Sequence, residues 1–161
     1  MRINKRKFIY LISPNKIRKS FYNDLIVVLK LKKVSFFQLR LKNMSFKKKL
    51  VIGKKIKKIC KKYKTKFLIN DDVLLAKKLD TDGCHLGQED MKIIKARKII
   101  KKKIIGVTCH NSIKLAKLTL KCLKSSVPSE DPGIAFVSGG QSELEATENL
   151  NLINKFNTTN F

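Results

Sequence analysis

Short apolar or β-branched runs alternate along this chain with longer stretches in which lysines line one helical face. The runs FIYLIS, FFQLRL and FLIN are of strand length, whereas the segments between them carry apolar residues at helical spacing. A strand buried on both faces reads as a continuous apolar run, and an amphipathic helix repeats every 3.6 residues. The alternation therefore predicts an α/β fold made of repeating strand-helix units around a parallel sheet.

About six such units are expected in the 161 residues. The strands are predicted at 8–13, 36–41, 67–71, 83–87, 104–109 and 133–138, and the helices at 20–32, 46–63, 73–79, 91–102, 112–124 and 143–156. The chain is one ordinary domain in length and falls short of the roughly 200 or more residues of a full eight-unit barrel.

The formal net charge of +25 comes mostly from lysines spread along the predicted helices. Nucleic-acid binding is one explanation of such an excess, because clustered basic residues neutralise phosphates. The sequence contains no zinc-finger spacing and no aromatic platform on which bases could stack. A solvated lysine surface is the favoured explanation, and a basic nucleic-acid-binding module is kept as an alternative.

The four cysteines show no paired spacing, which argues against a disulfide framework or a zinc site and favours the reduced thiols of a cytoplasmic protein. The N-terminal apolar run is too short for a signal peptide or a membrane span, and it meets Ser13 and Pro14. No membrane association is expected.

Acidic residues are scarce before residue 124, and six of them fall between Asp71 and Asp90. Asp71 follows the run FLIN, and Asp90 follows the run GCHLGQE. Active sites of parallel α/β folds are built at the carboxyl ends of strands, and oxygen ligands suit a hard cation such as Mg²⁺. Asp71 and Asp90 are therefore candidate metal ligands. Helix capping is the alternative for both, and Asp72 could take that role beside Asp71.

Gln38, Arg40 and Lys42 alternate in the run FFQLRLK, so a strand over this run would point all three the same way. If that face is buried, an anion must meet the two cations there, and a phosphate or diphosphate fits them. Charges facing water from an edge strand are the alternative. At the end of the fifth predicted strand, Thr108 could bind a phosphate oxygen, whereas His85 is interpreted as a packed strand residue.

A break in composition lies near residue 124, because the segment after it has five acidic residues and one basic residue, Lys155. The segment contains SGGQS, in which Ser138 and Gly139 precede a predicted helix. Glycines let backbone amides approach an anion, and a helix N-terminus favours negative charge. A phosphate site and a simple strand-to-helix turn are both compatible with this motif.

Four motifs in order, QLRLK at 38–42, LINDD at 68–72, DGCHLGQED at 82–90 and IIGVTCHNS at 104–112, resemble thiamine phosphate synthase over residues 7–118. The resemblance implies a parallel (β/α) barrel of the TIM type, here incomplete, and a transferase. Such an enzyme joins hydroxymethylpyrimidine diphosphate to a thiazole phosphate and releases diphosphate. It further implies diphosphate-substrate contacts and Mg²⁺ ligation by matching residues: Gln38, Arg40, Lys42, Asn70 and Thr108 for substrate, and Asp71 and Asp90 for metal.

The segment from about 118 to 155 resembles instead the C-terminal portion of class I fructose-bisphosphate aldolase. That resemblance implies phosphate binding by Ser138 and Gly139, but the aldolase lysine that forms the Schiff base has no counterpart here. The expected organisation is chimeric, with a synthase-like partial barrel at 1–124 and an aldolase-like strand-helix unit at 125–161.

The later phosphate-gripping loops of the synthase family are absent from this sequence, so impaired turnover is expected. A thiazole tautomerase of the same superfamily and an inactive aldolase-like remnant are the alternatives. An incomplete barrel leaves strand edges exposed, which favours self-association. The partners expected otherwise are the two small-molecule substrates.

Overall fold

The computed structural model of this protein describes residues 9–110, together with residues 112, 114, 116, 117, 119, 137 and 138. The chain divides into two compact units, Met1–Cys84 and His85–Phe161. None of the helices in the described part of the chain is long and apolar enough to cross a membrane.

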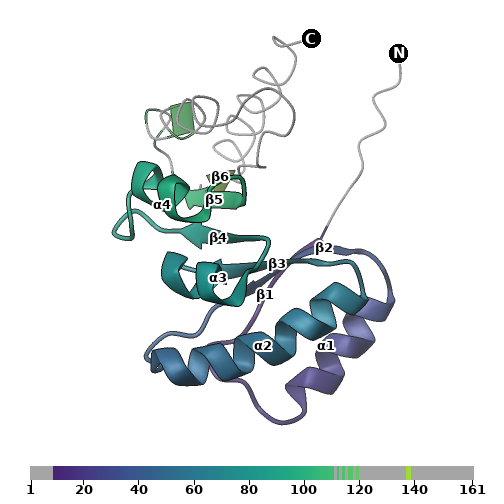
Figure 1. Cartoon of the computed structure of the whole chain (residues 1–161). Coiled ribbons are helices and arrows are strands. Elements are labelled where there is room, and N and C mark those ends of the chain that lie inside the picture. Colours follow the sequence, from purple (N-terminus) through teal and green to yellow (C-terminus); the bar gives the residue numbers. More distant parts are fainter. Residues whose placement is uncertain are drawn as a thin grey trace, which may run out of the picture. The chain divides into compact units, whose positions relative to one another are not determined.

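The first unit is built from alternating strands and helices (Figure 1). Strands β1, β2 and β3 lie side by side in sequence order and run parallel, with Gln38 paired to Ile12 on one side and to Leu68 on the other. The elements are β1 (Ile9–Ile12), α1 (Phe21–Lys30), β2 (Val34–Leu39), α2 (Phe46–Lys62), β3 (Lys66–Asn70) and α3 (Val73–Leu79), and β4 (Gly83–Leu86) crosses into the second unit.

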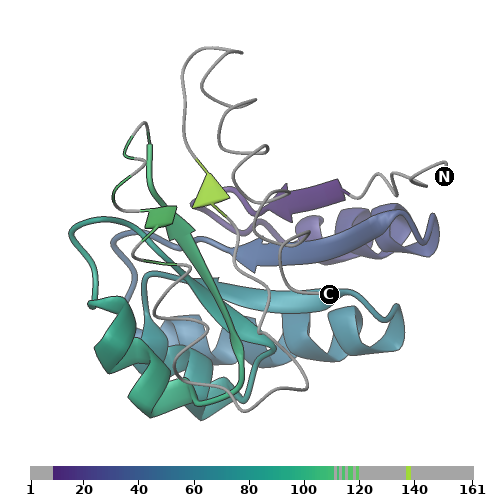
Figure 2. The same cartoon turned by 90° about the horizontal axis from the view of Figure 1, so that it is seen from above.

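Both faces of this three-stranded sheet are packed, each by different side chains. Helices α1 and α2 cover one face (Figures 1 and 2), where the Phe37 ring packs on Phe67 at 6.2 Å and on Phe21 of α1 at 6.2 Å between centroids. Because side chains alternate along a strand, Phe36 and Gln38 point to the opposite face. Both are buried, so the sheet has a packed surface on each side.

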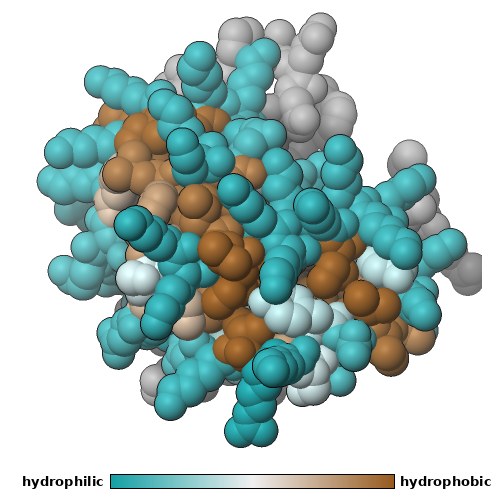
Figure 3. All heavy atoms as spheres, turned by 60° about the horizontal axis from the view of Figure 1, so that its bottom comes forward, coloured by the Kyte–Doolittle hydropathy of each residue, from teal (hydrophilic) through white to brown (hydrophobic). Residues whose placement is uncertain are grey.

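Helix α2 shows how the lysine-rich stretches fold. Gly53, Ile56 and Cys60 recur at helical spacing and form its buried stripe, while most of its lysines are exposed. Gly53 faces Leu79 of α3 so closely that a Cβ there would collide with that side chain. Figure 3 shows the resulting surface, in which hydrophilic side chains project around smaller hydrophobic patches.

The second unit contains the end of β4, α4 (Ile93–Ile100), β5 (Ile104–Thr108) and β6 (Val137–Ser138). Strands β5 and β6 are parallel, with Val107 opposite Val137. Arg97 closes the C-terminal end of α4, because its buried guanidinium donates to the carbonyl oxygens of Lys101 and of Lys103, the latter at 2.7 Å.

The predicted parallel α/β architecture is confirmed, with the bounds of most elements shifted by one or two residues. The helix predicted at 73–79 has those bounds. Residues 114, 116, 117 and 119 of the helix predicted at 112–124 are helical, and the helix predicted at 143–156 lies outside the described residues. The domain boundary at residue 124 also lies outside them. Six complete units and a barrel are not confirmed by the described elements.

Candidate functional site

The predicted site residues gather where strands end. In the first unit, Gln38 and Arg40 lie at the carboxyl end of β2 and Asn70 is the last residue of β3. In the second unit, Asp90 follows β4 and Thr108 is the last residue of β5. In open parallel sheets and in barrels alike, this is the edge at which ligands bind.

A chain of hydrogen bonds crosses the three strands of the first unit. The Tyr10 hydroxyl donates to Gln38 Oε1 at 2.7 Å, and Gln38 Nε2 donates to Asn70 Oδ1. Gln38 is only 3% exposed, and a partner at each end of its amide offsets much of the cost of burying it. Burial raises the pKa of Tyr10, and the nearby Cys84 raises it further, so the phenol keeps its proton.

Arg40 and Lys42 do not share a strand with Gln38, contrary to the sequence expectation. Strand β2 ends at Leu39, so Arg40 is not part of the backbone ladder. The Ser13 Oγ instead accepts the Arg40 backbone N–H at 2.9 Å. Arg40 is half-buried, with Nη1 donating to Asn15 Oδ1 at 3.3 Å, and Lys42 is exposed. The expectation that Arg40 and Lys42 are both buried, and so require an anion between them, is therefore wrong.

Asp71 occupies an unusual backbone conformation. The Asp72 N–H donates to the Asn70 carbonyl at 2.8 Å, which closes a three-residue turn around Asp71, whose φ is 64°. Positive φ is uncommon for residues other than glycine and often marks functional loops. Capping, the alternative role considered for Asp71, belongs to its neighbour, because Asp72 Oδ1 accepts the Leu75 N–H at 2.9 Å.

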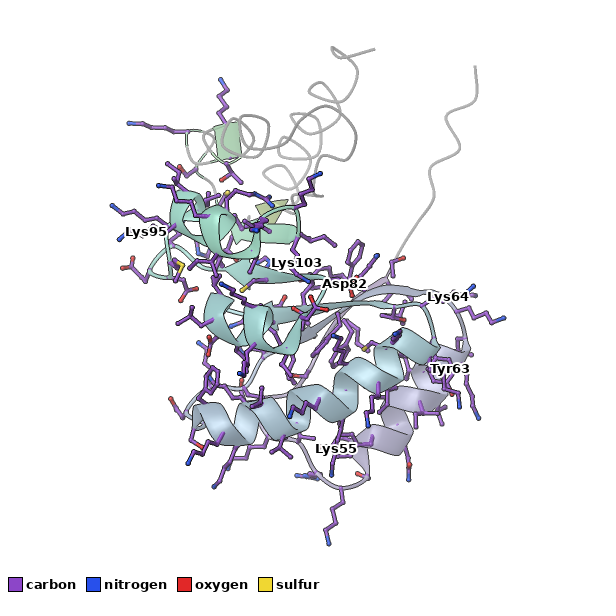
Figure 4. All side chains as sticks on the ribbon, viewed as in Figure 1. Lys55, Tyr63, Lys64, Asp82, Lys95 and Lys103 are labelled. Atoms are coloured by element: carbon purple, nitrogen blue, oxygen red, sulfur yellow. The ribbon has the colours of Figure 1, made fainter. Side chains whose placement is uncertain are left out.

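Two other carboxylates among the six acidic residues between Asp71 and Asp90 have structural roles. Asp82, labelled in Figure 4, accepts the Phe67 N–H at 2.9 Å and pairs with Lys66 at 3.1 Å, which ties the chain before β4 to β3. Asp80 ends α3 in a left-handed conformation and pairs with Lys57 at 3.4 Å. Within the described residues, no three His, Cys, Asp or Glu side chains form a metal cluster.

Asp90 folds back on the loop that follows β4. Its Oδ2 accepts the Gly87 N–H at 2.6 Å, and a Cβ on Gly87 would lie 2.9 Å from the same oxygen. The N-cap position of α4 is Lys92, so Asp90 is not its cap residue. One carboxylate oxygen thus fixes the loop, and Oδ1 is the oxygen that could ligate a cation.

Thr108 and His85 form a pair in the second unit. Nε2 of His85 lies 2.8 Å from Thr108 Oγ1, and the imidazole is buried. It packs directly on Gly106, where a Cβ would lie 2.5 Å from Nδ1. Burial lowers the pKa of His85, and Asp90 opposes that shift. His85 is a packed strand residue, as predicted, and it also contacts a candidate ligand-binding hydroxyl.

The backbone register brings Ser138 to Thr108. These two residues are Cα partners in the β5–β6 pairing. Thr108 and Ser138 are thus carried side by side at the ends of neighbouring strands. Gly139 lies outside the described residues, so the phosphate role of SGGQS stays a prediction.

Tyr10 is the residue of this region that the sequence reading did not single out. Its ring stacks on Phe36 of β2 with centroids 5.8 Å apart. A tyrosine in a short apolar strand is an available signal, because a buried phenol must find a hydrogen-bond partner. The identity of that partner depends on strand register, which the sequence does not specify.

Three comparisons with known proteins agree with one another. The family model described as thiamine monophosphate synthase matches residues 9–123. A thiamine-phosphate synthase of Pelagibacter ubique is 73% identical over 117 residues, which is 72% of this chain and 56% of that protein. One from Campylobacter jejuni is 44% identical over 103 residues, or 62% of this chain and 49% of that protein. The chain therefore spans about half the length of these curated relatives.

A solved structure shares the fold. Thiamine phosphate pyrophosphorylase from Pyrococcus furiosus superposes with a TM-score of 0.64, covering 93% of this chain and 83% of that one at 24% sequence identity. The family match ends at residue 123, and the aldolase likeness predicted for 125–161 is not shown by these comparisons.

Proposed function

Because the chain belongs to the thiamine monophosphate synthase family, we propose that it binds hydroxymethylpyrimidine diphosphate and acts in its transfer to a thiazole phosphate. One observation carries the proposal: the family match over residues 9–123 contains Gln38, Arg40, Asn70 and Thr108, which lie at carboxyl ends of strands. Ligand sites of parallel α/β folds are built at those ends.

In this proposal the neutral and the charged side chains of the site bind different features of the ligand. Gln38 and Asn70 are joined amides with N–H donors left over, which suit acceptor atoms of the pyrimidine and its diphosphate. Arg40 and the exposed Lys42 suit the diphosphate charge, with a planar fork and a mobile point charge respectively. The Thr108 hydroxyl would bind a phosphate oxygen, with Ser138 and Gly139 as further candidates.

We propose Asp71 and Asp90 as ligands of Mg²⁺. Each is a carboxylate at the end of a strand, and each lies in a fixed loop, Asp71 through its turn and Asp90 through Gly87. Two carboxylates are sufficient for Mg²⁺, which keeps several waters and takes phosphate oxygens as its other ligands. When bound, the ion would neutralise charge on the diphosphate.

The protein's own part in the reaction would be electrostatic. As the bond from the pyrimidine methylene carbon to the diphosphate oxygen breaks, negative charge grows on the leaving diphosphate. Arg40 and Lys42 are the basic groups proposed to stabilise that charge. The thiazole nitrogen supplies the electron pair for the new bond, so this step requires no general base.

Calorimetry tests the binding half of the proposal directly. The chain should bind the pyrimidine diphosphate with Mg²⁺ present and much more weakly with a chelator, because the carboxylates and the diphosphate share the ion. Equal affinity in both conditions would refute the metal assignment. Asp71→Asn and Asp90→Asn should each reduce the effect of Mg²⁺.

Arg40→Ala separates the anion site from the general positive charge of the surface. It should weaken diphosphate binding by about 2 kcal/mol, the scale of a charge-assisted hydrogen bond. The matched control is Lys58→Ala, which removes one positive charge from the exposed side of α2. Equal losses in the two variants would mean that the ligand senses only net charge.

Turnover is tested separately from binding. Complementation of a thiamine-requiring strain that lacks the synthase reports whether this chain completes the transfer to thiazole phosphate. Growth that is lost in Asp71→Ala would extend the proposal from binding to catalysis. Binding without growth would restrict it to the diphosphate half of the reaction.

We propose that the strand-helix units are part of an incomplete TIM-type barrel, with the aldolase-like segment beginning near residue 125. Self-association follows from the edge of the first unit, where Ile9 and Ile12 of β1 are 48% and 51% exposed. Sedimentation should show oligomers that Ile12→Lys reduces. Ile94→Lys, at an exposed position on α4, is the control.

A cytoplasmic location is part of the same proposal. Cys60 and Cys109 are buried thiols, and burial raises the pKa of Cys60 to about 12. Thiols kept protonated in the core fit a reducing compartment. Slow alkylation of both residues in the folded protein would be consistent with this arrangement.

A further inference from the structure

Tyr10 is held in place independently of any ligand. It lies opposite Phe36 in the β1–β2 register, and the two rings stack at an interplanar angle of 23°. Gln38 lies two residues further along β2, on the same face as Phe36. The stacked ring therefore directs the hydroxyl toward the carboxyl end of the sheet, where it donates to Gln38.

The hydrogen bonds continue diagonally across the sheet. Gln38 is paired with Leu68 of β3, and Asn70 is two residues beyond Leu68 on the same face. Each step from Tyr10 to Gln38 to Asn70 thus crosses one strand and advances toward the carboxyl ends. The line ends at the edge where Arg40 follows β2.

The direction of donation determines what the amides offer a ligand. An amide carries one carbonyl acceptor and two N–H donors. Gln38 uses Oε1 for Tyr10 and one N–H for Asn70, and Asn70 uses Oδ1 for Gln38. One N–H of Gln38 and two of Asn70 remain. With the opposite direction of donation, Gln38 Oε1 would accept from Asn70, and Asn70 would present its carbonyl oxygen and one N–H in place of two N–H groups.

We propose that Tyr10 is a positioning residue that sets the orientation of the Gln38 and Asn70 amides, so that this part of the site presents donors and selects ligands with acceptor atoms facing it. The inference deepens the proposed function and rests on it for the identity of the ligand. Phosphate oxygens and unprotonated ring nitrogens are the two sources of such acceptors, and inorganic diphosphate and pyrimidine diphosphate distinguish them as probes.

Tyr10→Phe is the decisive variant, because it removes the hydroxyl and keeps the ring that stacks on Phe36. Binding of the pyrimidine diphosphate to the full chain should weaken on the order of tenfold, the effect of misorienting one buried hydrogen-bonded group. If the acceptor is a ring nitrogen, binding of inorganic diphosphate should change little. If it is a phosphate oxygen, both ligands should weaken together.

A double-mutant cycle separates positioning from a general structural effect. In a Gln38→Ala background, Tyr10→Phe should cause no further loss of affinity, because the amide that it orients is gone. Equal losses in both backgrounds would overturn the inference. So would an unchanged affinity in Tyr10→Phe when Gln38→Ala alone weakens binding. No effect of Gln38→Ala would count against the proposed function instead.

NMR of the ligand-free chain tests the orientation when no ligand binds. The side-chain amide protons of Gln38 should show through-space contacts to Asn70 and not to the Tyr10 ring. In Tyr10→Phe, contacts between those protons and the ring should appear as the amide turns over. Contacts to the Tyr10 ring in the unmodified chain would show the opposite orientation and refute the proposal.

Discussion

The two units of this chain hold their polar groups at strand ends by different means. In the first, three neutral groups on three strands form the chain Tyr10–Gln38–Asn70. In the second, an imidazole and a hydroxyl form the pair His85–Thr108. Both bury polar atoms beside predicted ligand-binding groups. Only the second contains a histidine, whose pKa burial lowers from its ordinary value.

The difference indicates two ways to keep a buried polar group in one orientation. Gln38 is fixed by a partner at each end of its amide, so its orientation depends on hydrogen bonds. His85 is fixed from the side, because Gly106 leaves room for the ring against its backbone. The first arrangement should be sensitive to loss of a polar partner, and the second to added volume.

The largest expected effect is the loss of the polar partner in the first unit. Gln38→Leu keeps a side chain of similar volume but leaves the Asn70 carbonyl without its donor, which costs about 2 kcal/mol of unfolding free energy. Urea denaturation measures the loss. Thr108→Val, at a half-buried position of the second unit, should cost about 1 kcal/mol or less. Similar losses of unfolding free energy in the two variants would show that the two units depend equally on their polar partners.

The second prediction concerns added volume. Gly106→Ala places a methyl group against the His85 ring, which must shift away from Thr108, at a cost of about 2 kcal/mol. His85→Ala in the same chain should relieve the overlap, so the two changes together should cost less than the sum of the single changes. Additive losses would show that Gly106 does not position the ring.

The strand and helix locations could be predicted because the apolar periods are local. The run KFLIN and the helix at 73–79 are examples, since the residues around each specify the element. The end of β2 could not be predicted in this way, because there the Arg40 N–H bonds to Ser13 Oγ, a contact between residues distant in sequence. Asp72 could be foreseen as a cap from its position before an apolar run, which leaves Asp71 for another role.

The sequence predicts which residues belong to the site, but it does not predict how their side chains contact one another. Gln38 and Asn70 were identified, but the link between them requires the β2–β3 register. Tyr10 was overlooked for the same reason. The contact between His85 and Gly106 depends on packing between residues distant in sequence, and a glycine within a strand pattern signals such close approach without naming the partner.

Substitutions of Asp71 should have a smaller effect on stability, and they separate the role of its backbone conformation from the role of its carboxylate. Asp71→Ala should lose about 1 kcal/mol of stability, because alanine is strained at a φ of 64°, whereas Asp71→Asn should lose less since asparagine tolerates this region. Thermal unfolding compares the two variants. Both remove the carboxylate, so both should reduce binding of Mg²⁺ equally. Equal stability would mean that the turn carries no strain.

The smallest effect is the pH dependence that only the second unit should show. The pKa of His85 is lowered by burial, so the unfolded chain binds its proton more readily than the folded chain does. The contribution of His85 to the unfolding free energy is fully present above about pH 6.5, the ordinary pKa of histidine. It declines as the pH falls from there toward the lowered pKa of the folded chain. Asp90 opposes the shift, so Asp90→Asn should enlarge the decline.

Comparison with a variant isolates this contribution from all other titrating groups. His85→Asn keeps a polar side chain that can reach Thr108 but does not titrate, so the stability difference between it and the unmodified chain should shrink as pH falls below about 6.5. Tyr10→Phe should differ from the unmodified chain by a constant amount over the same range, because the raised pKa of Tyr10 keeps its hydroxyl neutral throughout. A constant difference for His85→Asn would show that the imidazole titrates as it does in water, and the contrast between the two units would then be lost.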